Sequence, residues 1–209
     1  LRHNPTDYFN GVTMVRKLHR WRIAVAVGLG WFVIGPAGAG AQVAVFDQVG
    51  LIGAPVTIAV RTGGLLSADG GRIVDLALAG EPLGRVMTGA DGFGYRRVAP
   101  ERAGLLRIDA RSEGRHGSGR LLVLNSTDRA VLIEVETALK ATIVGAAERD
   151  DCRSALESIS RRYRLVYVTR WLGADFSRTR IAPAGLPESV VLPWKGAALL
   201  RSLQDQGVQ

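Results

Sequence analysis

The chain contains very little cysteine and histidine. One of its 209 residues is cysteine, Cys152, and three are histidine. A single cysteine excludes an internal disulfide framework and a cysteine-based zinc site, and we expect Cys152 to pack on the apolar face of a helix. Beyond residue 41 the sequence keeps one histidine, His116, in a loop rich in Gly and Ser. A multi-histidine metal site is therefore excluded, and a Ser-His-Asp triad is not expected.

Lysine is also scarce, and the positive charge is not concentrated in one block. The formal net charge is +8, but residues 42–209 hold 22 basic and 18 acidic side chains. Nearly all the basic residues are Arg, and they are scattered along the chain. Nucleic-acid-binding domains gather such residues on one face or one helix. We therefore expect no nucleic-acid partner.

Long hydrophobic runs are absent except near the N-terminus. Met14 precedes a basic stretch over 16–22, an apolar run over 23–34 and a small-residue stretch that ends in Ala41. This order predicts a secretory signal peptide at 14–41 and export to the periplasm or the exterior. The alternative is an uncleaved single-pass anchor, since residues 23–41 carry no charge and a helix of ~20 residues spans a bilayer. Residues 1–13 read as an unstructured upstream segment.

Residues 42–126 read as short strands separated by turns. Segments with strand character include 55–60, 73–78, 84–88, 93–98, 105–110 and 120–124. Asp91 and Gly92 lie between two of them, and because Asp-Gly tolerates positive φ they predict a hairpin. About seven strands at this spacing predict a small all-β sandwich.

Three strings in this region resemble bacterial immunoglobulin-like domains: 53–57, 88–93 and 99–108. The second holds a Thr-x-x-Asp-Gly turn before a strand, and the third holds Pro-x-x-x-Gly before the next strand. The resemblance implies an immunoglobulin-like β-sandwich that serves as a spacer, binds a surface ligand or orients the next domain.

From residue 127 the pattern changes to alternating strands and helices. We expect a strand at 130–136, a loop through Gly145, a helix from about 148 to 163 and a strand at 165–169. A loop or helix at 172–182, a strand at 189–192 and a helix at 196–206 follow. This alternation predicts an α/β Rossmann-like domain with a parallel sheet over 127–209, incomplete at its C-terminal end. Sites in such sheets lie at the carboxyl ends of the strands.

The same region resembles the haloacid dehalogenase-like phosphatases, in particular the phosphatidate-phosphatase and lipin-like branch. That family ends its first strand in Asp-x-Asp-x-Thr, whose first Asp attacks phosphorus while the second acts as acid/base. By this resemblance Glu134 falls on the nucleophile position and Glu136 on the acid/base position. Ala138 falls where the motif has Thr. The same two glutamates would be the metal ligands if the domain held Mg²⁺.

The second and third motifs of that family bind the phosphoryl group. The stretch 160–169 is the strongest single match, and it places Thr169, followed by Arg170, on the phosphate-binding position. Lys195 matches the third motif. The resemblance therefore implies a phosphate site made of Thr169, Arg170 and Lys195, while the last acidic metal-binding motif is not found.

The altered motifs favour binding over catalysis. Glutamate in place of aspartate moves a carboxylate by about one methylene, and misplacement of ~1 Å can lower a rate ~100-fold. The main hypothesis is thus an exported envelope protein with an inactive phosphatase-like domain that acts in binding or scaffolding. We expect it to need no cofactor, and its partner to be a phosphorylated ligand or an envelope protein. One alternative is a Mg²⁺-dependent phosphatase of phospholipid or phosphoprotein with Glu134 as nucleophile. Another is a purely structural module held at a membrane by an uncleaved N-terminal helix.

Overall fold

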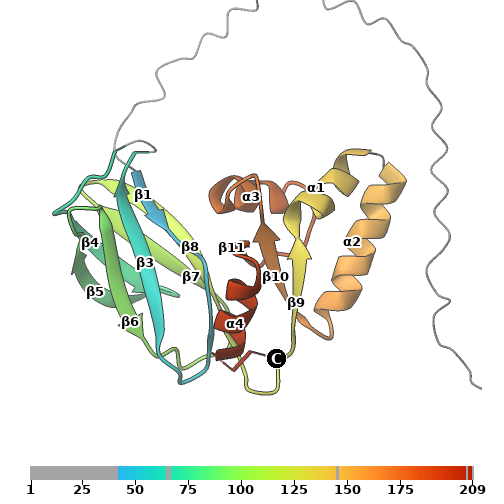
Figure 1. The fold of residues 1–209 in the computed structure, drawn as a ribbon, viewed down its shortest axis with the longest axis horizontal. Helices are drawn as coiled ribbons and strands as arrows, with labels where there is room; N and C mark the ends of the chain where they lie inside the picture. The colour runs from blue at the N-terminus through green and yellow to red at the C-terminus, as the bar shows by residue number, and fades with distance from the viewer. Residues whose placement is uncertain (1–41, 65–66, 145, 206, 209) are drawn as a thin grey trace, which may run out of the picture. The chain divides into compact units, whose positions relative to one another are not determined.

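A computed structural model describes residues 42–64, 67–144, 146–205 and 207–208 (Figure 1). The predicted upstream segment and signal peptide lie outside these residues. The described residues belong to one compact unit. No helix in the described ranges is long and apolar enough to cross a bilayer.

Eight strands form two sheets that pack face to face. One sheet has the order β1-β3-β6 and the other the order β2-β8-β7-β4-β5. The strands are β1 (Gln42–Val45), β2 (Gln48–Leu51), β3 (Val56–Gly63), β4 (Ile73–Leu78), β5 (Glu81–Met87), β6 (Phe93–Val98), β7 (Gly104–Ser112) and β8 (Arg115–Leu124). The predicted all-β sandwich is therefore present.

Alternating side chains of both sheets make the sandwich core. Ile58 and Val60 of β3 are fully buried against Val74 of β4, Ile108 of β7 and Leu121 of β8. Successive residues of a strand point to opposite faces, so every second position enters this core. This burial explains why apolar and polar residues alternate along these strands in the sequence.

The predicted hairpin at Asp91 and Gly92 is wrong. β5 pairs with β4 in the larger sheet, whereas β6 pairs with β3 in the smaller one. The turn therefore carries the chain from one sheet to the other. It is closed by Gly92 at φ 77° and by a hydrogen bond from the Phe93 N–H to the Asp91 carboxylate, 3.0 Å. Asp-Gly specifies a tight turn, and a tight turn can join two strands of one hairpin or two strands of different sheets.

A third sheet of three parallel strands follows the sandwich in the chain. Its order is β11-β10-β9. Its strands are β9 (Ala130–Glu134), β10 (Arg164–Thr169) and β11 (Val190–Pro193), and the helices around it are α1 (Val135–Val144), α2 (Ala146–Ser160), α3 (Ala174–Ile181) and α4 (Ala197–Asp205). The predicted alternation of strands and helices is found here.

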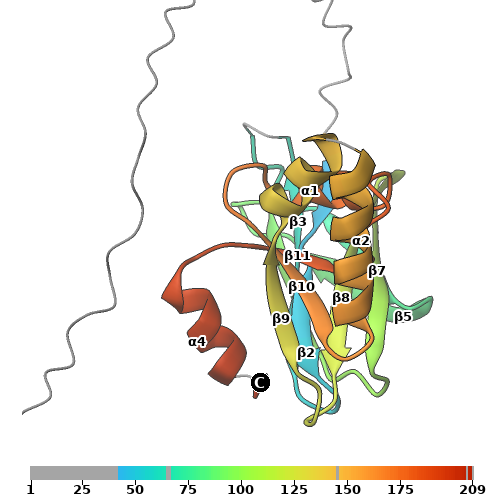
Figure 2. The same cartoon turned by 90° about the vertical axis from the view of Figure 1, so that its right-hand side faces the viewer.

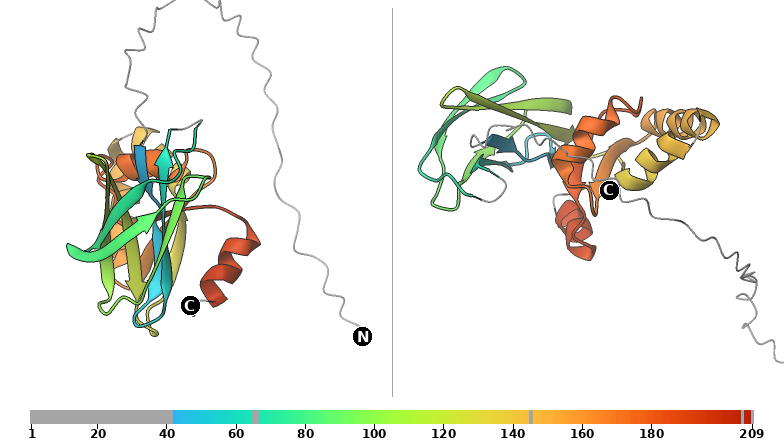
Figure 3. Two further views of the ribbon diagram at one scale, coloured as in Figure 1. Left: turned by 90° about the vertical axis from the view of Figure 1, so that its left-hand side faces the viewer. Right: turned by 90° about the horizontal axis from the view of Figure 1, so that it is seen from above.

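The two faces of the parallel sheet have different cover. On one face, Leu165 and Tyr167 of β10 pack with residues of α1, α2 and α3. On the other, Val166 packs with Leu122 and Leu124 of β8 and with Leu203 of α4. The order of layers is visible from above in Figure 3, and Figure 2 shows α4 set apart from α1 and α2. One side of the parallel sheet is thus covered by the sandwich.

The predicted Rossmann-like domain is not supported. Such a domain has helices on both faces of an open sheet. Here the parallel sheet has three strands in the described ranges, and β2 and β8 cover much of one face. A small parallel layer packed on a β-sandwich describes the observed arrangement.

The predicted strand at 130–136 and the loop after it are also corrected. β9 ends at Glu134, and α1 begins at once with Val135. Glu136 is therefore in the first turn of a helix, where a negative charge suits the helix dipole. Val135, Ala138 and Leu139 are buried at helical spacing and hold α1 against the sheet. This packing outweighs the β-branched residues that made the segment look extended.

Candidate functional site

Glu136 and Thr169 meet at the carboxyl edge of the parallel sheet. The Thr169 hydroxyl donates a hydrogen bond of 2.6 Å to Glu136 Oε1. The backbone N–H groups of Arg170, Trp171 and Leu172 donate to the same oxygen at 2.8, 2.9 and 3.3 Å. Four donors from the end of β10 and the loop after it thus surround one carboxylate oxygen of α1.

These contacts hold Glu136 in its charged form. Burial raises the pKa of Glu136, but the hydrogen bonds from the Thr169 hydroxyl and from backbone N–H groups, those of the following loop among them, outweigh it and lower the pKa from 4.5 to about 2. A proton acceptor or donor near neutral pH needs a pKa near that range. Glu136 is therefore placed to anchor the loop, and it is poorly suited to the acid/base role that the resemblance implied.

Glu134 and Arg170 form the exposed part of the same edge. Arg170 Nε lies 3.6 Å from Glu134 Oε1, and both side chains are more than a third exposed. The Thr137 hydroxyl donates to Glu134 Oε2 at 3.1 Å. The Arg170 guanidinium lies 5.5 Å from the ring centroid of Trp194. Since ion pairs of this exposure contribute ~0–1 kcal/mol, Glu134 and Arg170 are adjacent but loosely held.

The structure brings four of the five predicted site residues together: Glu134, Glu136, Thr169 and Arg170. Lys195 follows β11 and is exposed, and it makes no hydrogen bond or ion pair with the described part of the chain. It lines a groove that is formed with residues of the sandwich. The predicted phosphate site of Thr169, Arg170 and Lys195 stays a prediction, and an anion there would have to displace Glu136 from its donors.

Glu134 and Glu136 do not fit a magnesium ion. Mg²⁺ requires a near-octahedral set of oxygen ligands. Glu136 Oε1 already accepts four hydrogen bonds, which leaves Oε2, without a partner in the described part of the chain, as the one free oxygen of this side chain. No third His, Cys, Asp or Glu joins the two glutamates, and no group of three such residues able to hold a metal occurs in the described ranges.

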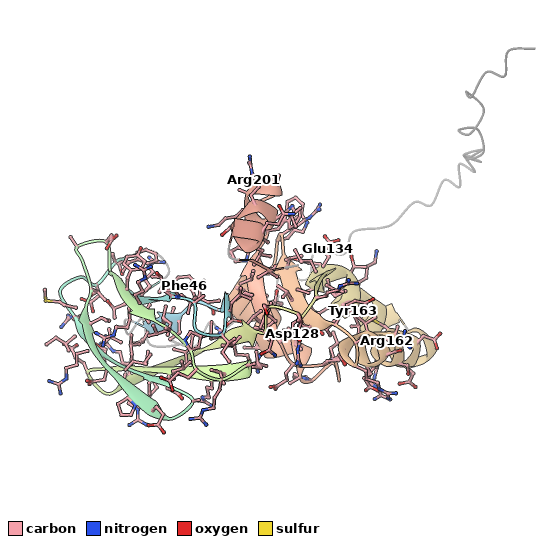
Figure 4. The ribbon with its side chains drawn as sticks, turned by 90° about the horizontal axis from the view of Figure 1, so that it is seen from below. Phe46, Asp128, Glu134, Arg162, Tyr163 and Arg201 are labelled. Carbon is pink, nitrogen blue, oxygen red and sulfur yellow. The ribbon has the colours of Figure 1, made fainter. Side chains whose placement is uncertain are left out.

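A groove of about 630 Å³ lies between the smaller sandwich sheet and α4. Phe46, Phe93 and Tyr95 line one side of it, and Lys195 and Leu199 line the other. In Figure 4, Phe46 and Glu134 lie on opposite sides of α4. The groove is thus a separate surface from the edge that holds the two glutamates.

Three nearly parallel aromatic rings form the sandwich side of the groove. The ring centroids of Phe46 and Phe93 are 5.8 Å apart with an angle of 19° between the planes. Those of Phe93 and Tyr95 are 6.2 Å apart with an angle of 10°. Phe46 is 36% exposed and Tyr95 60% exposed. Phe93 and Tyr95 are two positions apart on β6, so both point away from the sandwich core.

Asp47 is buried behind the groove. Its side chain is 1% exposed, and its Oδ1 lies 2.6 Å from an Arg178 guanidinium nitrogen. The backbone N–H groups of Arg120 and Val191 donate to its two oxygens, each at 2.8 Å. Burial raises the pKa of Asp47, while Arg178 and the two N–H groups oppose that rise. Asp47 thus joins the sandwich, α3 and β11 through one carboxylate.

Sequence reasoning missed the groove and Asp47. The i, i+2 spacing of Phe93 and Tyr95 around an inward Gly94 was available as a sign of an aromatic outer face. Nothing in the sequence associates these rings with α4, about a hundred residues later. Asp47 carries no local signal at all, because its partners lie at positions 120, 178 and 191.

No family model matches the chain. No curated protein matches it either. Among solved structures, the chain is similar to a polysaccharide lyase (17% identity, 49% of this chain and 13% of the lyase, TM-score 0.32). It is also similar to the fibronectin(III)-like modules of Clostridium thermocellum CbhA (14%, 42% and 48%, TM-score 0.30) and to an IG27 protein domain (10%, 40% and 99%, TM-score 0.31). At such TM-scores the likeness carries no weight for function, and the sandwich is established by its own strand pairing.

The predicted relationship to the haloacid dehalogenase-like phosphatases is wrong. The solved structures to which the chain is similar include immunoglobulin-like and fibronectin-like β domains, and no family model of such a phosphatase matches the chain. The residues that suggested the family are Glu134 and Glu136, the stretch 160–169 that ends in Thr169, and Lys195.

Proposed function

We propose that the chain is an exported protein that acts by binding or scaffolding at the cell envelope, with the groove beside α4 as its ligand site. The single observation that carries the proposal is the groove itself: about 630 Å³, bordered by three parallel aromatic rings. Ligand sites are typically concave, mostly apolar and 300–1,000 Å³ in size. Export rests on the signal-like sequence at 14–41.

The carboxyl edge of the parallel sheet supports binding over catalysis. The donors that would receive an anionic substrate there are occupied by Glu136. Glu136 is held as a carboxylate with a pKa of about 2, and its partner Glu134 is engaged by Arg170 and Thr137. The donors around Glu136 are thus taken up by a structural contact, while Glu134 and Arg170 stay exposed beside it.

The groove is tested with the uncharged dye Nile red, whose fluorescence rises in an apolar site. We expect saturable binding to the full chain with one dye per protein. Tyr95→Ala removes an exposed ring and should weaken binding at least fivefold with little effect on folding. Tyr163→Ala is the matched control, since Tyr163 is also exposed, at 37%, but lies after α2.

Two results would refute the groove as a ligand site. One is the absence of saturable dye binding to a protein whose circular dichroism shows it folded. The other is equal weakening by Tyr95→Ala and Tyr163→Ala. Export is tested separately by expressing the chain in a bacterium and measuring the mature mass, which should correspond to a start at Gln42. A mass that includes residues 14–41 would favour the uncleaved anchor.

A further inference from the structure

Among the described residues that line the groove, Lys195 is the one cation, and no anion there is available. Lys195 lines it, is exposed, and has no hydrogen bond or ion pair with the described residues. The acidic residue on its lining is Asp47, whose carboxylate is 1% exposed and held by Arg178. A positive charge at the rim of an apolar site attracts a negative group and disfavours a positive one.

The walls of the groove are mostly apolar. Phe46, Phe93 and Tyr95 of the sandwich, Ala198 and Leu199 of α4, and Leu192 of β11 all line it. Leu199 is only partly buried although it belongs to the core between α4 and the parallel sheet. A ligand that lies between the rings and α4 would therefore bury apolar surface on both sides, which is the main source of affinity in such sites.

We propose that the groove binds a small amphiphilic anion, with its apolar body between the aromatic rings and α4 and its charged head at Lys195. This proposal rests on the groove being the ligand site. A soluble single molecule fits better than a membrane surface, because the apolar side chains line a concave groove between two elements. A lipid surface would require them on a convex or flat face.

The test uses decanoate and its uncharged counterpart decanol as competitors of Nile red on the full chain. Decanoate should displace the dye from the unaltered protein at a concentration at least fivefold lower than from the Lys195→Gln variant. The variant loses the charge-assisted contact with the carboxylate. Decanol should compete equally, within twofold, on both proteins. Shortening decanoate to octanoate should weaken binding about tenfold, at roughly three- to fourfold per methylene.

Lys140→Gln is the matched control, because Lys140 is an exposed lysine on α1. It should leave decanoate binding unchanged. If Lys195→Gln binds decanoate as the unaltered protein does, the anionic head is refuted while the groove as an apolar site remains. If Tyr95→Ala leaves decanoate binding unchanged, the anion binds elsewhere and the proposal is overturned.

Vesicles separate a soluble ligand from a membrane. The chain should not sediment with phosphatidylglycerol vesicles any more than with phosphatidylcholine vesicles. Sedimentation with the anionic vesicles without competition by monomeric decanoate would overturn the proposal in favour of a membrane surface. If neither competitor nor dye binds, the proposed function fails together with this inference.

Discussion

Removing the carboxylate of Asp47 should loosen the sandwich from the parallel layer. The residue lies in the two-residue link between β1 and β2, and its oxygens accept from Arg178 at 2.6 Å and from the N–H groups of Arg120 and Val191 at 2.8 Å. Asp47→Ala leaves two backbone donors and a guanidinium, 17% exposed, without this partner. The substitution thus affects β8, α3 and β11 at once.

The expected loss is about 3–5 kcal/mol in the free energy of unfolding. Truncating one partner of a buried ion pair costs about 3–5 kcal/mol, and each buried donor left unpaired costs about 1–3 kcal/mol. The two figures overlap, and Arg178 keeps its contact with Asp175, so the sum is not reached. Asp47→Asn keeps one acceptor oxygen and should lose about half as much. Natural domains have only about 5–15 kcal/mol in total.

Urea unfolding followed by circular dichroism measures this loss. Asp75→Ala is the control, because Asp75 pairs with Arg85 at 2.8 Å but both side chains are well over half exposed; it should change the free energy by less than about 0.5 kcal/mol. A double-mutant cycle with Arg178→Met should give a coupling of at least about 1 kcal/mol. A loss below 1 kcal/mol for Asp47→Ala, or a loss equal to that of the control, would refute the reasoning.

Three further outcomes follow from single contacts. Glu136 has a pKa of about 2 in the folded state, below its unfolded value of 4.5, so its stabilisation of the fold is complete above pH 5 and is lost as the pH falls from 4.5 to 2. After reduction for solvent screening, we expect this stabilisation to be about 1–2 kcal/mol. Acid unfolding of the Glu136→Gln variant should therefore depend less on pH than that of the unaltered protein. Gly119→Ala should lose about 1–3 kcal/mol in urea unfolding, because a Cβ there would lie 2.7 Å from Val45 Cγ1, and no loss would show that β1 moves freely. Tyr167→Phe should lose about 1 kcal/mol in the same assay, since the buried hydroxyl donates to the Pro187 carbonyl at 2.9 Å, and a gain would contradict that contact.

Six of the eight described strands of the sandwich could be predicted because local rules decide them, whereas β1 and β2 were not predicted. The segment 73–78 matches β4 residue for residue, and 93–98 matches β6. β4 alternates between the core and the exterior along its length, whereas β6 does so only over Phe93, Gly94 and Tyr95. Both segments are bounded by glycine or turn residues. Partner choice is not local, however. The chain changes sheets between β5 and β6, and the turn at Asp91 serves a crossing as well as it would serve a hairpin.

Helix α1 shows the limit of reading periodicity alone. Val135, Thr137 and Val144 favour extended structure by propensity. The helical signal, Val135 with Ala138 and Leu139, covers a single turn and decides the outcome only because those side chains meet the parallel sheet. Because of that tertiary contact, Glu136 lies in a helix and not at the end of a strand. Glu134 and Glu136 therefore do not share one strand, as the prediction of a strand at 130–136 had placed them.

The structure places Thr169 and Glu136 at one edge of the parallel sheet, and their mutual contact there could not be foreseen from the sequence. Parallel strands bring their carboxyl ends together, so Thr169 was expected near the acidic residues that follow β9. Whether the N–H groups at this edge bind a ligand or a carboxylate of the protein itself depends on the direction of the Glu136 side chain. The loop after Thr169 encloses Glu136, and four donors converge on its Oε1.

Strand β8 explains why the two halves of the chain are not independent. Leu121 and Val123 face the sandwich core, whereas Leu122 and Leu124 face the core shared with the parallel sheet. A strand that is apolar on both faces must be covered on both. The parallel layer provides the second cover, and Asp47 fixes its position with charged and backbone hydrogen bonds. Because α4 packs on this same layer, the distance between the aromatic rings and Lys195 is set by the sandwich and the parallel sheet together. The groove therefore depends on residues from both halves of the sequence.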